Sequence, residues 1–310
     1  QWATISGMIE SGSTTLTPTV SLAGTYILLV TNTATGCTST SSTVVLNDAN
    51  APLALIAQPS VLTCVTQQVN INAGGSTQVG NVSYVWSGPG IVSGQGTLLL
   101  GVNEPGTYTL QVTNNANGCT DDATIVVLQD TVAPLALAGV DVLINCYTPT
   151  GTLGSATNPS GAGYSLLWTT VGGNFTSPTN GPAATIDQSG TYQLLITNTQ
   201  NGCTDTDNVV VAADFAVPQA DAGPTSELTC VLTSIMLQGT GSVGGIYSYL
   251  WSTNGGNILS GGTTLTPTIN SDGDYTLLVT NTQNGCTFND QVTITQSADG
   301  DGPPDAAPAH

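Results

Sequence analysis

A set of landmark residues recurs about every 83 residues along this chain, and the repeat constrains the fold more than any other feature. Tryptophans within short apolar runs recur at this spacing. So do a tyrosine in a Gly-x-Tyr context and the cysteine of an Asn/Thr-Gly-Cys-Thr motif. A second cysteine series follows the same spacing. The series are Trp2, Trp86, Trp168 and Trp251; Tyr26, Tyr108, Tyr192 and Tyr275; Cys37, Cys119, Cys203 and Cys286; and Cys64, Cys146 and Cys230.

These series divide the chain into one partial repeat, three complete repeats and a tail. Each joint carries an Asp followed four residues later by a Pro, and such short linkers leave little freedom between neighbouring domains. We expect the polypeptide to continue at both ends; alternatively, a strand donated by another chain completes the partial repeat. The predicted domains are 1–47 (the C-terminal half of a repeat), 48–129, 130–213 and 214–298, with 299–310 as a linker or the start of a next repeat.

The strand pattern within one repeat predicts a two-sheet sandwich. Tyr275, Leu277 and Val279 alternate with more polar residues, so they share one face of a strand. About seven short strands per repeat, with turns every ten residues or so, are typical of an immunoglobulin-like domain. The Trp and Tyr series then provide the core anchors, with each Tyr forming a tyrosine corner. An exposed Trp platform for sugar binding is the alternative. The predicted fold class is all-β, namely tandem immunoglobulin-like β-sandwich repeats with the spacing given above.

The charge composition excludes several classes of function. The chain has no Lys or Arg, and its formal net charge is -19. It therefore cannot neutralise phosphates, so we expect no binding to nucleic acid and none to anionic membranes. No apolar run has the length of a membrane span, so we expect no membrane insertion of this segment. Without Lys, Arg or an internal His we expect no catalytic residues, and we interpret the pairs Asp205/Asp207 and Asp272/Asp274 as solvated turn residues.

One motif resembles a known family. The run Gly-Thr-Tyr-Thr-Leu-Gln-Val-Thr-Asn-Asn-Ala-Asn-Gly-Cys-Thr at 106–120, together with Leu62-Thr63-Cys64 ahead of a strand, resembles the Ig-like and PKD-like repeats of giant Bacteroidetes surface adhesins, including the SprB-type gliding adhesins. The resemblance covers essentially the whole chain and recurs in every repeat. It implies type IX secretion, an extracellular or cell-surface location, and a role in adhesion, gliding motility or surface-filament formation.

The seven cysteines indicate disulfides in an oxidising compartment, because the chain has no Cys-x-x-Cys pair and its one His is His310. Two pairing schemes remain open. In an immunoglobulin-like topology the Leu-x-Cys cysteine lies at the bottom of the sandwich and the Gly-Cys cysteine at the top, too far apart for a bridge within one repeat. The scheme within repeats pairs Cys64 with Cys119, Cys146 with Cys203 and Cys230 with Cys286, which leaves Cys37; the scheme between repeats pairs Cys64 with Cys203 and Cys146 with Cys286.

Apolar residues on the outer face of the predicted sheets suggest a lateral contact. If the tryptophans point inward, their strand neighbours point outward, as do residues on the adjacent strand. A contact repeated in every unit would let chains bundle or domains pack; the alternative is scattered exposed apolar residues, which are common. The residues concerned are Leu29, Leu195, Leu278, Val85, Leu167 and Leu250.

The joints and loops carry candidate sites for a metal ion and for glycans. Aspartates at the joints supply the hard oxygen ligands that Ca²⁺ takes, although an Asp beside a Pro also simply begins a turn. Two sequons would carry N-glycans, and Asp130-Thr131-Val132 resembles the O-glycosylation site of Bacteroidetes secreted proteins. The candidates are Asp48, Asp130, Asp214, Asp299 and Asp301 for calcium, and Asn81, Asn174 and Thr131 for glycans; no other cofactor is expected.

Three functions fit these features. The first is a structural stalk or extracellular filament whose partners are neighbouring repeats or identical chains. The second is an adhesive module that binds a glycan or a partner protein, with the ligand expected at the longest departures from the repeat, 87–96 and 170–180. The third is an accessory domain of a hydrolase. The equivalence of the repeats favours the first.

Overall fold

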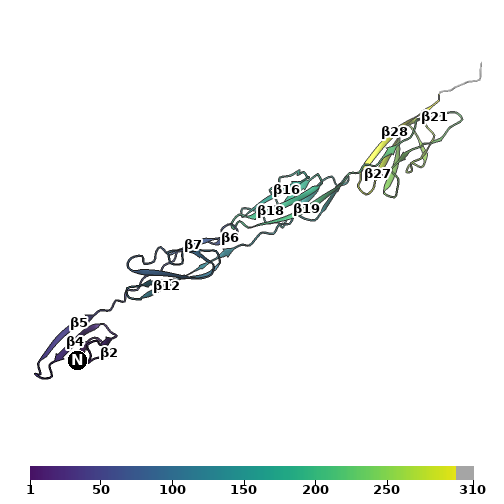
Figure 1. The fold of residues 1–310 in the computed structure, drawn as a ribbon. Helices are drawn as coiled ribbons and strands as arrows, with labels where there is room; N and C mark the ends of the chain where they lie inside the picture. The colour runs from purple at the N-terminus through teal and green to yellow at the C-terminus, as the bar shows by residue number, and fades with distance from the viewer. Residues whose placement is uncertain (298–310) are drawn as a thin grey trace, which may run out of the picture. The chain divides into compact units, whose positions relative to one another are not determined.

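A computed structural model describes residues 1–297 of the chain (Figure 1). All regular elements in this range are β-strands. The chain divides into two compact units, Gln1–Thr131 and one that begins at Val132. The first unit holds the partial repeat and the first complete repeat, and the second unit holds the other two.

The second complete repeat shows the topology most clearly. One sheet has the order β14-β19-β18-β16, in which β14 is parallel to β19 and the other pairs are antiparallel. The facing pair is β15-β17. This arrangement is the A′-G-F-C sheet facing B and E of an immunoglobulin-like sandwich. The strands are β14 (Val142–Asn145), β15 (Gly151–Gly154), β16 (Tyr164–Val171), β17 (Ala183–Ile186), β18 (Gly190–Asn198) and β19 (Thr204–Asp214).

The third complete repeat has the same plan. Its first sheet has the order β21-β28-β27-β24, with β21 parallel to β28. Its second sheet is β22-β26-β25, and a short pair β20-β23 begins the repeat. The strands are β20 (Ala220–Asp221), β21 (Ser226–Leu228), β22 (Ile235–Met236), β23 (Thr240–Gly241), β24 (Tyr247–Asn254), β25 (Ile258–Ser260), β26 (Thr268–Ile269), β27 (Gly273–Asn281) and β28 (Thr287–Gln296).

The first complete repeat also has two sheets, β12-β11-β8 and β7-β10-β9, with a short parallel pair β13-β6. Strands β13 and β19 each run one residue past the predicted boundaries at 129/130 and 213/214. The strands are β6 (Leu62–Thr63), β7 (Val69–Asn72), β8 (Val82–Ser87), β9 (Ile91–Ser93), β10 (Leu99–Val102), β11 (Gly106–Asn114), β12 (Thr120–Val127) and β13 (Gln129–Asp130).

The partial repeat forms two small sheets, β1-β4-β5 and β2-β3, which correspond to strands C, F, G and D, E. Residues 1–47 contain no counterpart of β14 or β15. A hollow of about 250 Å³, lined among others by Trp2, Leu16 and Tyr26, lies on the inner face of this half-sandwich. Completion by a donated strand stays a prediction. The strands are β1 (Trp2–Ile5), β2 (Ile9–Ser11), β3 (Thr19–Val20), β4 (Gly24–Thr31) and β5 (Thr38–Val45).

Each complete repeat has its own hydrophobic core, built around its tryptophan and tyrosine. Trp86, Trp168 and Trp251 are buried, whereas Trp2 of the partial repeat is only half-buried. All four indole N–H groups donate to backbone carbonyls, and for the three buried tryptophans this satisfies the polar atom inside the core.

The four tyrosines form tyrosine corners. Each phenol is buried, and its hydroxyl donates to the carbonyl of the residue four positions earlier. The same hydroxyl also contacts the backbone of the loop that follows strand C. The O–O distances are 2.5 Å for Tyr26 to Leu22, 2.6 Å for Tyr108 to Glu104, 2.6 Å for Tyr192 to Gln188 and 2.7 Å for Tyr275 to Ser271.

Aspartates hold the start of each complete repeat to its last strand. Asp205 and Asp207 lie in β19 and accept the backbone N–H groups of Ala136 and Ala138, both at 2.8 Å. These carboxylates are half-buried acceptors, so the prediction of solvated turn residues was wrong for this pair. A carboxylate substitutes here for a strand pairing and satisfies backbone donors. The equivalent bonds, also 2.8 Å long, join Ala54 to Asp121 and Ala222 to Asp290.

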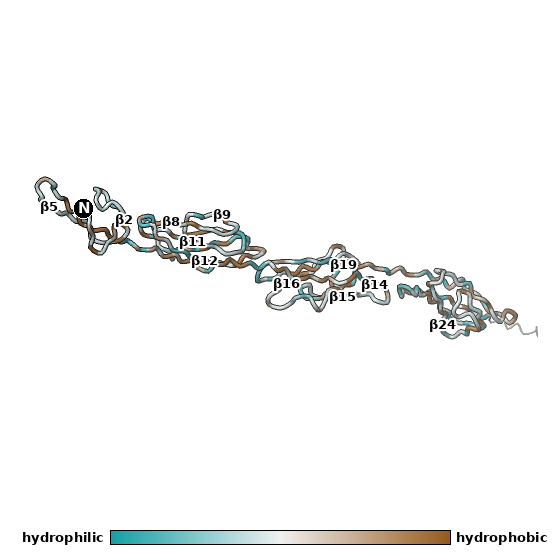
Figure 2. The backbone as a smooth tube through the Cα atoms, turned by 90° about the horizontal axis from the view of Figure 1, so that it is seen from below, coloured by the Kyte–Doolittle hydropathy of each residue, from teal (hydrophilic) through white to brown (hydrophobic). Residues whose placement is uncertain are grey.

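Hydrophobic residues occur in every repeat, interspersed with hydrophilic ones (Figure 2). In an antiparallel sandwich this alternation places one face of each strand in the core and the other toward water. Within residues 1–297 there is no helix of the length and apolarity required to cross a membrane.

Candidate functional site

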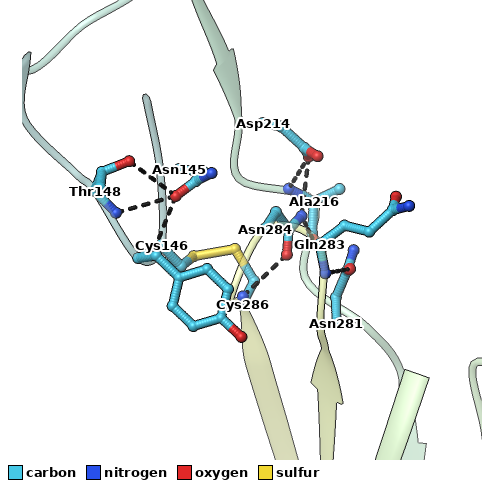
Figure 3. Close-up of a disulfide and its surroundings, with 10 residues drawn as sticks. Asn145, Cys146, Thr148, Asp214, Ala216, Asn281, Gln283, Asn284 and Cys286 are labelled. Carbon is cyan, nitrogen blue, oxygen red and sulfur yellow. Dashed lines mark hydrogen bonds between the residues drawn. A yellow bond between two sulfur atoms is a disulfide. The ribbon is translucent and has the colours of Figure 1, made fainter. Parts of the chain in front are cut away.

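A disulfide joins two consecutive repeats of the second unit (Figure 3). Cys146 directly follows β14 of the second complete repeat, and Cys286 directly precedes β28 of the third. Their sulfurs are 2.01 Å apart and their Cα atoms 5.0 Å apart, across a sequence separation of 140 residues. The bridge is the one predicted by the scheme between repeats.

The scheme within repeats was wrong, because its two cysteines lie at opposite ends of a sandwich. Cys203 precedes β19, whereas Cys146 follows a strand that pairs with the far end of β19, where Asn145 lies opposite Asp214. The eleven residues of β19 separate the start of the strand, next to Cys203, from its end, next to Asn145, and this length corresponds to roughly 35 Å. A disulfide spans Cα atoms only about 5–6 Å apart.

Four of the seven cysteines are bonded. Cys64 and Cys203 are also in disulfide form. Cys37, Cys119 and Cys230 are free within the residues that the structure describes, so a disulfide at these three stays a prediction. Their free state follows from the pairing rule: the Leu-x-Cys or Ile-x-Cys cysteine of one repeat bonds the Gly-Cys cysteine of the next, and residues 1–310 contain no such partner for these three.

One side of the joint is a tight turn that presents Cys146, which we call the plug turn (residues 145–148). The Asn145 side-chain oxygen accepts the backbone N–H groups of Tyr147 and Thr148, both at 3.0 Å. The backbone N–H of Asn145 donates to the carbonyl of Thr148, also at 3.0 Å. These bonds satisfy the backbone of the turn locally and fix the direction of the cysteine side chain.

The other side is the turn between β27 and β28, which we call the socket turn (residues 281–286). The Gly285 N–H donates to the carbonyl of Asn281 at 2.8 Å, and the Asn281 N–H donates to that of Cys286 at 2.9 Å. Gly285 has a φ of 75°, and a Cβ added there would lie 2.6 Å from carbons of the Tyr147 ring. Glycine is therefore required both by the backbone conformation and by the ring of the plug turn.

Asn284 of the socket turn holds the linker between the two repeats. Its side-chain NH₂ donates to Asp214 Oδ1 at 2.9 Å and to the carbonyl of Ala216 at 3.0 Å, while its oxygen accepts the N–H of Cys286 at 2.9 Å. The residue is only 1% exposed, so these bonds are shielded from water. The run Asn284-Gly285-Cys286 thus provides the side chain that holds the linker, which we call the linker clamp, the glycine against which the Tyr147 ring packs, and the thiol of the disulfide.

The clamp recurs in other repeats. Asn201 donates to the carbonyl of Val132 at 3.0 Å, and Asn117 donates to that of Asn50 at 3.1 Å. Sequence reasoning identified the Gly-Cys motif but missed the role of this asparagine. The available signal was its presence before Gly-Cys in three of the four copies, with Thr35 in the fourth.

The joint aspartates form turns. Asp48 Oδ1 accepts hydrogen bonds from the backbone N–H and from the side-chain NH₂ of Asn50. Asp214 Oδ1 accepts the backbone N–H of Ala216. In the part of the chain that the structure describes, no three His, Cys, Asp or Glu side chains group as metal ligands. Asp299 and Asp301 lie outside the described residues. Calcium binding at Asp48, Asp130 and Asp214 stays a prediction.

The other candidate residues lie at the surface. Leu29, Val85, Leu167 and Leu250 are exposed, while Leu195 and Leu278 are half-buried, opposite Leu167 and Leu250 on the neighbouring strand. Whether they make a lateral contact stays a prediction.

Glycosylation is untested as well. Asn81, Asn174 and Thr131 are exposed. The side-chain nitrogen of Asn174 donates to Asp187 at 2.8 Å, a bond that a glycan would break.

A surface hollow of about 530 Å³ lies at the start of the third complete repeat. It is lined by Val217, Pro218, Gln219, Ala220, Asp221, Thr240, Gly241 and Phe288. None of these residues belongs to the loops 87–96 and 170–180, where a ligand was predicted.

No protein-family model matches the chain, and no curated protein matches it. Solved structures of tandem immunoglobulin-like domains do. Sidekick-1 immunoglobulin domains 1–5 match at 15% identity over 88% of this chain and 66% of that chain, with a TM-score of 0.30. The titin I-band fragment I67–I69 matches at 13% over 81% and 100%, with a TM-score of 0.37. The N-terminal eight Ig domains of Down Syndrome Cell Adhesion Molecule match at 12% over 89% and 40%, with a TM-score of 0.36.

At these identities the likeness concerns the fold alone. The strand order supplies the argument: A′-G-F-C faces B and E, with A′ parallel to G and a tyrosine corner at the start of F. The chain is a tandem array of immunoglobulin-like repeats. In such an array the joint formed by the plug turn and the socket turn, rather than a pocket in one domain, is the most elaborated site.

Proposed function

We propose that this chain is a segment of an extracellular stalk or filament, in which disulfides between consecutive immunoglobulin-like repeats carry tension. The observation that supports the proposal is the Cys146–Cys286 bond. A bridge within one domain would strengthen that domain alone. A bridge between neighbours gives a second covalent connection beside the linker.

The position of the bond determines which residues tension would reach. Pulling on the second unit would load residues 132–146, cross the disulfide and continue along β28. The segment between the two cysteines would carry no force while the bond is intact. At about 3.5 Å per residue, a separation of 140 residues hides roughly 490 Å of contour length.

The finer assignment is a surface adhesin of the gliding type. Disulfides are typical of oxidising, extracellular surroundings, and the resemblance at 106–120 favours such an adhesin secreted by the type IX route. The partners in this proposal are neighbouring repeats and, in a fibre, identical chains.

An adhesive role is the second candidate, because the 530 Å³ hollow carries the exposed ring of Phe288. An aromatic ring beside polar backbone is a common surface for a glycan or a peptide. Binding to a glycan array that is lost in Phe288→Ala and retained in Phe215→Ala, another exposed phenylalanine, would support this role.

Single-molecule pulling tests the stalk proposal, with handles attached at residues 132 and 297 of the full chain so that the force path of the wild type runs through Cys146 and Cys286 and not through the disulfide-bonded Cys64 or Cys203. Under oxidising conditions we expect no extension step that releases the segment between Cys146 and Cys286. Cys146→Ser should add roughly 490 Å of extension. A wild-type chain that releases this length without a reductant would contradict the proposal.

A further inference from the structure

The third complete repeat differs from the other two at one hydrogen bond. Each complete repeat begins with a Pro that is followed two residues later by an Ala. In the first two, the N–H of this Ala donates to an aspartate that stands two residues after the Gly-Cys cysteine. The bonds join Ala54 to Asp121 and Ala136 to Asp205, both at 2.8 Å. In the third repeat the corresponding residues are Ala220 and Phe288, so the carboxylate is replaced by an aromatic ring.

The N–H of Ala220 points away from β23. On the β23 side, the carbonyl of Gln219 accepts the N–H of Ser242 at 3.0 Å, and the Gln219 N–H donates to Ser242 Oγ at 2.9 Å. Successive residues of a strand direct their backbone polar groups to opposite edges, so the N–H of Ala220 is directed toward β28. Ala222 has the same direction, and its N–H donates to Asp290 of β28 at 2.8 Å. Within residues 1–297, no side chain accepts the N–H of Ala220.

The 530 Å³ hollow lies where the carboxylate is replaced. Ala220 and Phe288 both line it, and the side chain of Phe288 is 49% exposed. A backbone donor that leaves water needs an acceptor, which the first two repeats supply from their own chain. The hollow therefore combines an open aromatic surface with a backbone donor that is suited to an oxygen atom of a ligand.

The charges around the hollow favour a neutral ligand oxygen. Asp221 lines the hollow, and the chain has no Lys or Arg to compensate the charge of a second carboxylate. The other polar side chains of the lining are the neutral, exposed Gln219 and Thr240. An amide carbonyl accepts a hydrogen bond without carrying a charge. It could therefore take the position of the aspartate oxygen without electrostatic repulsion.

The backbone edge is too short for a peptide strand. A peptide that extends a sheet uses alternating donors and acceptors along several residues. Of the three residues 218, 220 and 222 on this edge, Pro218 has no N–H, and the N–H of Ala222 is bonded to Asp290. Ala220 alone offers a donor. A sugar requires only one such donor, because its C–H face packs on an aromatic ring and its hydroxyl groups bond to polar side chains.

We propose that the hollow binds a neutral sugar that carries an acetamido group, an N-acetylhexosamine. The acetamido oxygen accepts the N–H of Ala220, in the position that a carboxylate oxygen has in the first two repeats, and the hexose ring lies against Phe288. This assignment rests on the adhesive role, the second candidate function above, and adds to it a class of ligand and the donor that selects it.

An amide NMR titration of the full chain, with its disulfides intact, tests the assignment. The probes are methyl N-acetyl-β-glucosaminide and its galacto epimer, and the control is methyl β-glucoside, which lacks the acetamido group. We expect an acetamido sugar to shift the Ala220 amide signal and to bind about tenfold more tightly than the control, since the additional hydrogen bond contributes roughly 1.4 kcal/mol. Equal affinities, or no binding of either acetamido sugar, would overturn the proposal. A shift of the Ala220 amide caused by acetyl-trialanine amide alone would overturn it in favour of a peptide ligand.

Phe288→Asp is the most specific variant, because it restores the residue type found at Asp121 and Asp205. Its carboxylate should accept the N–H of Ala220 and occupy the position of the ligand oxygen. We expect an unchanged or higher melting temperature, together with a loss of affinity for the acetamido sugar of about tenfold or more. Phe215→Asp introduces the same charge at another exposed phenylalanine and should retain the affinity. Equal affinities of the two variants would overturn the proposal.

The same measurements separate this assignment from the adhesive role itself. If Phe288→Ala abolished binding to a glycan array while Phe288→Asp bound the acetamido sugar as the wild type does, the adhesive role would stand and the assignment would fail. If the wild type bound neither the array nor the sugars, both would fail.

Discussion

Asn145 and Asp214 lie opposite each other at the last pair of the parallel ladder between β14 and β19. From Asn145 the chain enters the disulfide-bonded Cys146, and from Asp214 it enters the linker to the next repeat. Both covalent connections between the two repeats therefore leave from the same level of one sheet. The parallel pair fixes their spacing.

Removing the disulfide should destabilise the second unit strongly. In the loop-entropy model, a bridge across 140 residues contributes about 5 kcal/mol by restricting the unfolded chain. We expect Cys146→Ser to lower the free energy of unfolding of the second unit by several kcal/mol in urea titrations. Cys230→Ser, at a free cysteine, should leave it unchanged. Equal midpoints for the two variants would argue against a stabilising bridge.

The linker clamp should be sensitive to loss of the Asn284 side chain. Asn284→Ala would leave buried partners unsatisfied, among them the N–H of Cys286. We expect a loss of about 1–3 kcal/mol in the stability of the third complete repeat, measured by chemical denaturation. Gln283→Ala, at the exposed neighbour, is the matched control and should change little. A neutral Asn284→Ala would show that the clamp contributes nothing.

The aspartate bonds at the start of a repeat provide a third prediction. Asp207→Ala removes the acceptor of the Ala138 N–H and should cost about 1.5–3 kcal/mol, since the bond involves a charged group. Asp207→Asn retains an oxygen acceptor and should recover part of that loss. Amide hydrogen exchange at Ala138 provides a local measurement. If the alanine variant left this amide protected, the bond would have no structural role.

The pKa of Tyr108 predicts sensitivity to alkaline pH. Burial raises this pKa above the ordinary value of 10.0, and the negative charge of Glu104 raises it further. The folded state therefore holds the proton more tightly than the unfolded chain. Its contribution to stability is complete below about pH 10 and is lost as the pH rises through the raised pKa.

Glu104→Gln tests the electrostatic part of this effect. The variant removes the charge and retains the backbone carbonyl that accepts the Tyr108 hydroxyl at 2.6 Å. We expect the pKa of Tyr108 to fall toward its ordinary value in a titration of phenolate absorbance, with Tyr108→Phe used to assign the signal. A titration identical to that of the wild type would exclude the contribution of Glu104.

The fold could be predicted from the sequence because its signals are local and repeated. A tryptophan in an apolar strand and a tyrosine after Gly-x identify two strands of a sandwich in each repeat, and the strands lie where the alternation of residues such as Tyr275, Leu277 and Val279 indicates. The parallel strand beside β19 and the end of β19 at Asp214 depend on pairing between distant segments, which periodicity does not reveal.

The site was predicted only in part. Both pairing schemes fitted the spacing of the cysteines, and the choice depends on the end of the sandwich at which each cysteine lies, a property of three-dimensional structure. The roles of Asn284 and Asp207 were missed for a similar reason. Their partners, the carbonyl of Ala216 and the N–H of Ala138, lie about 70 residues away in the sequence. Every residue type has such backbone groups, so the amino-acid sequence does not show which of them will be a partner.

The disulfide at Cys146 makes the joint dependent on the redox state of its surroundings. In oxidising medium two covalent connections leave one edge of the second complete repeat, so bending between it and its neighbour meets resistance on both sides. A reductant would leave residues 215–219 as the single covalent connection, braced by the side chain of Asn284. The same polypeptide would then pass from a stiff spacer to a flexible hinge without unfolding either repeat.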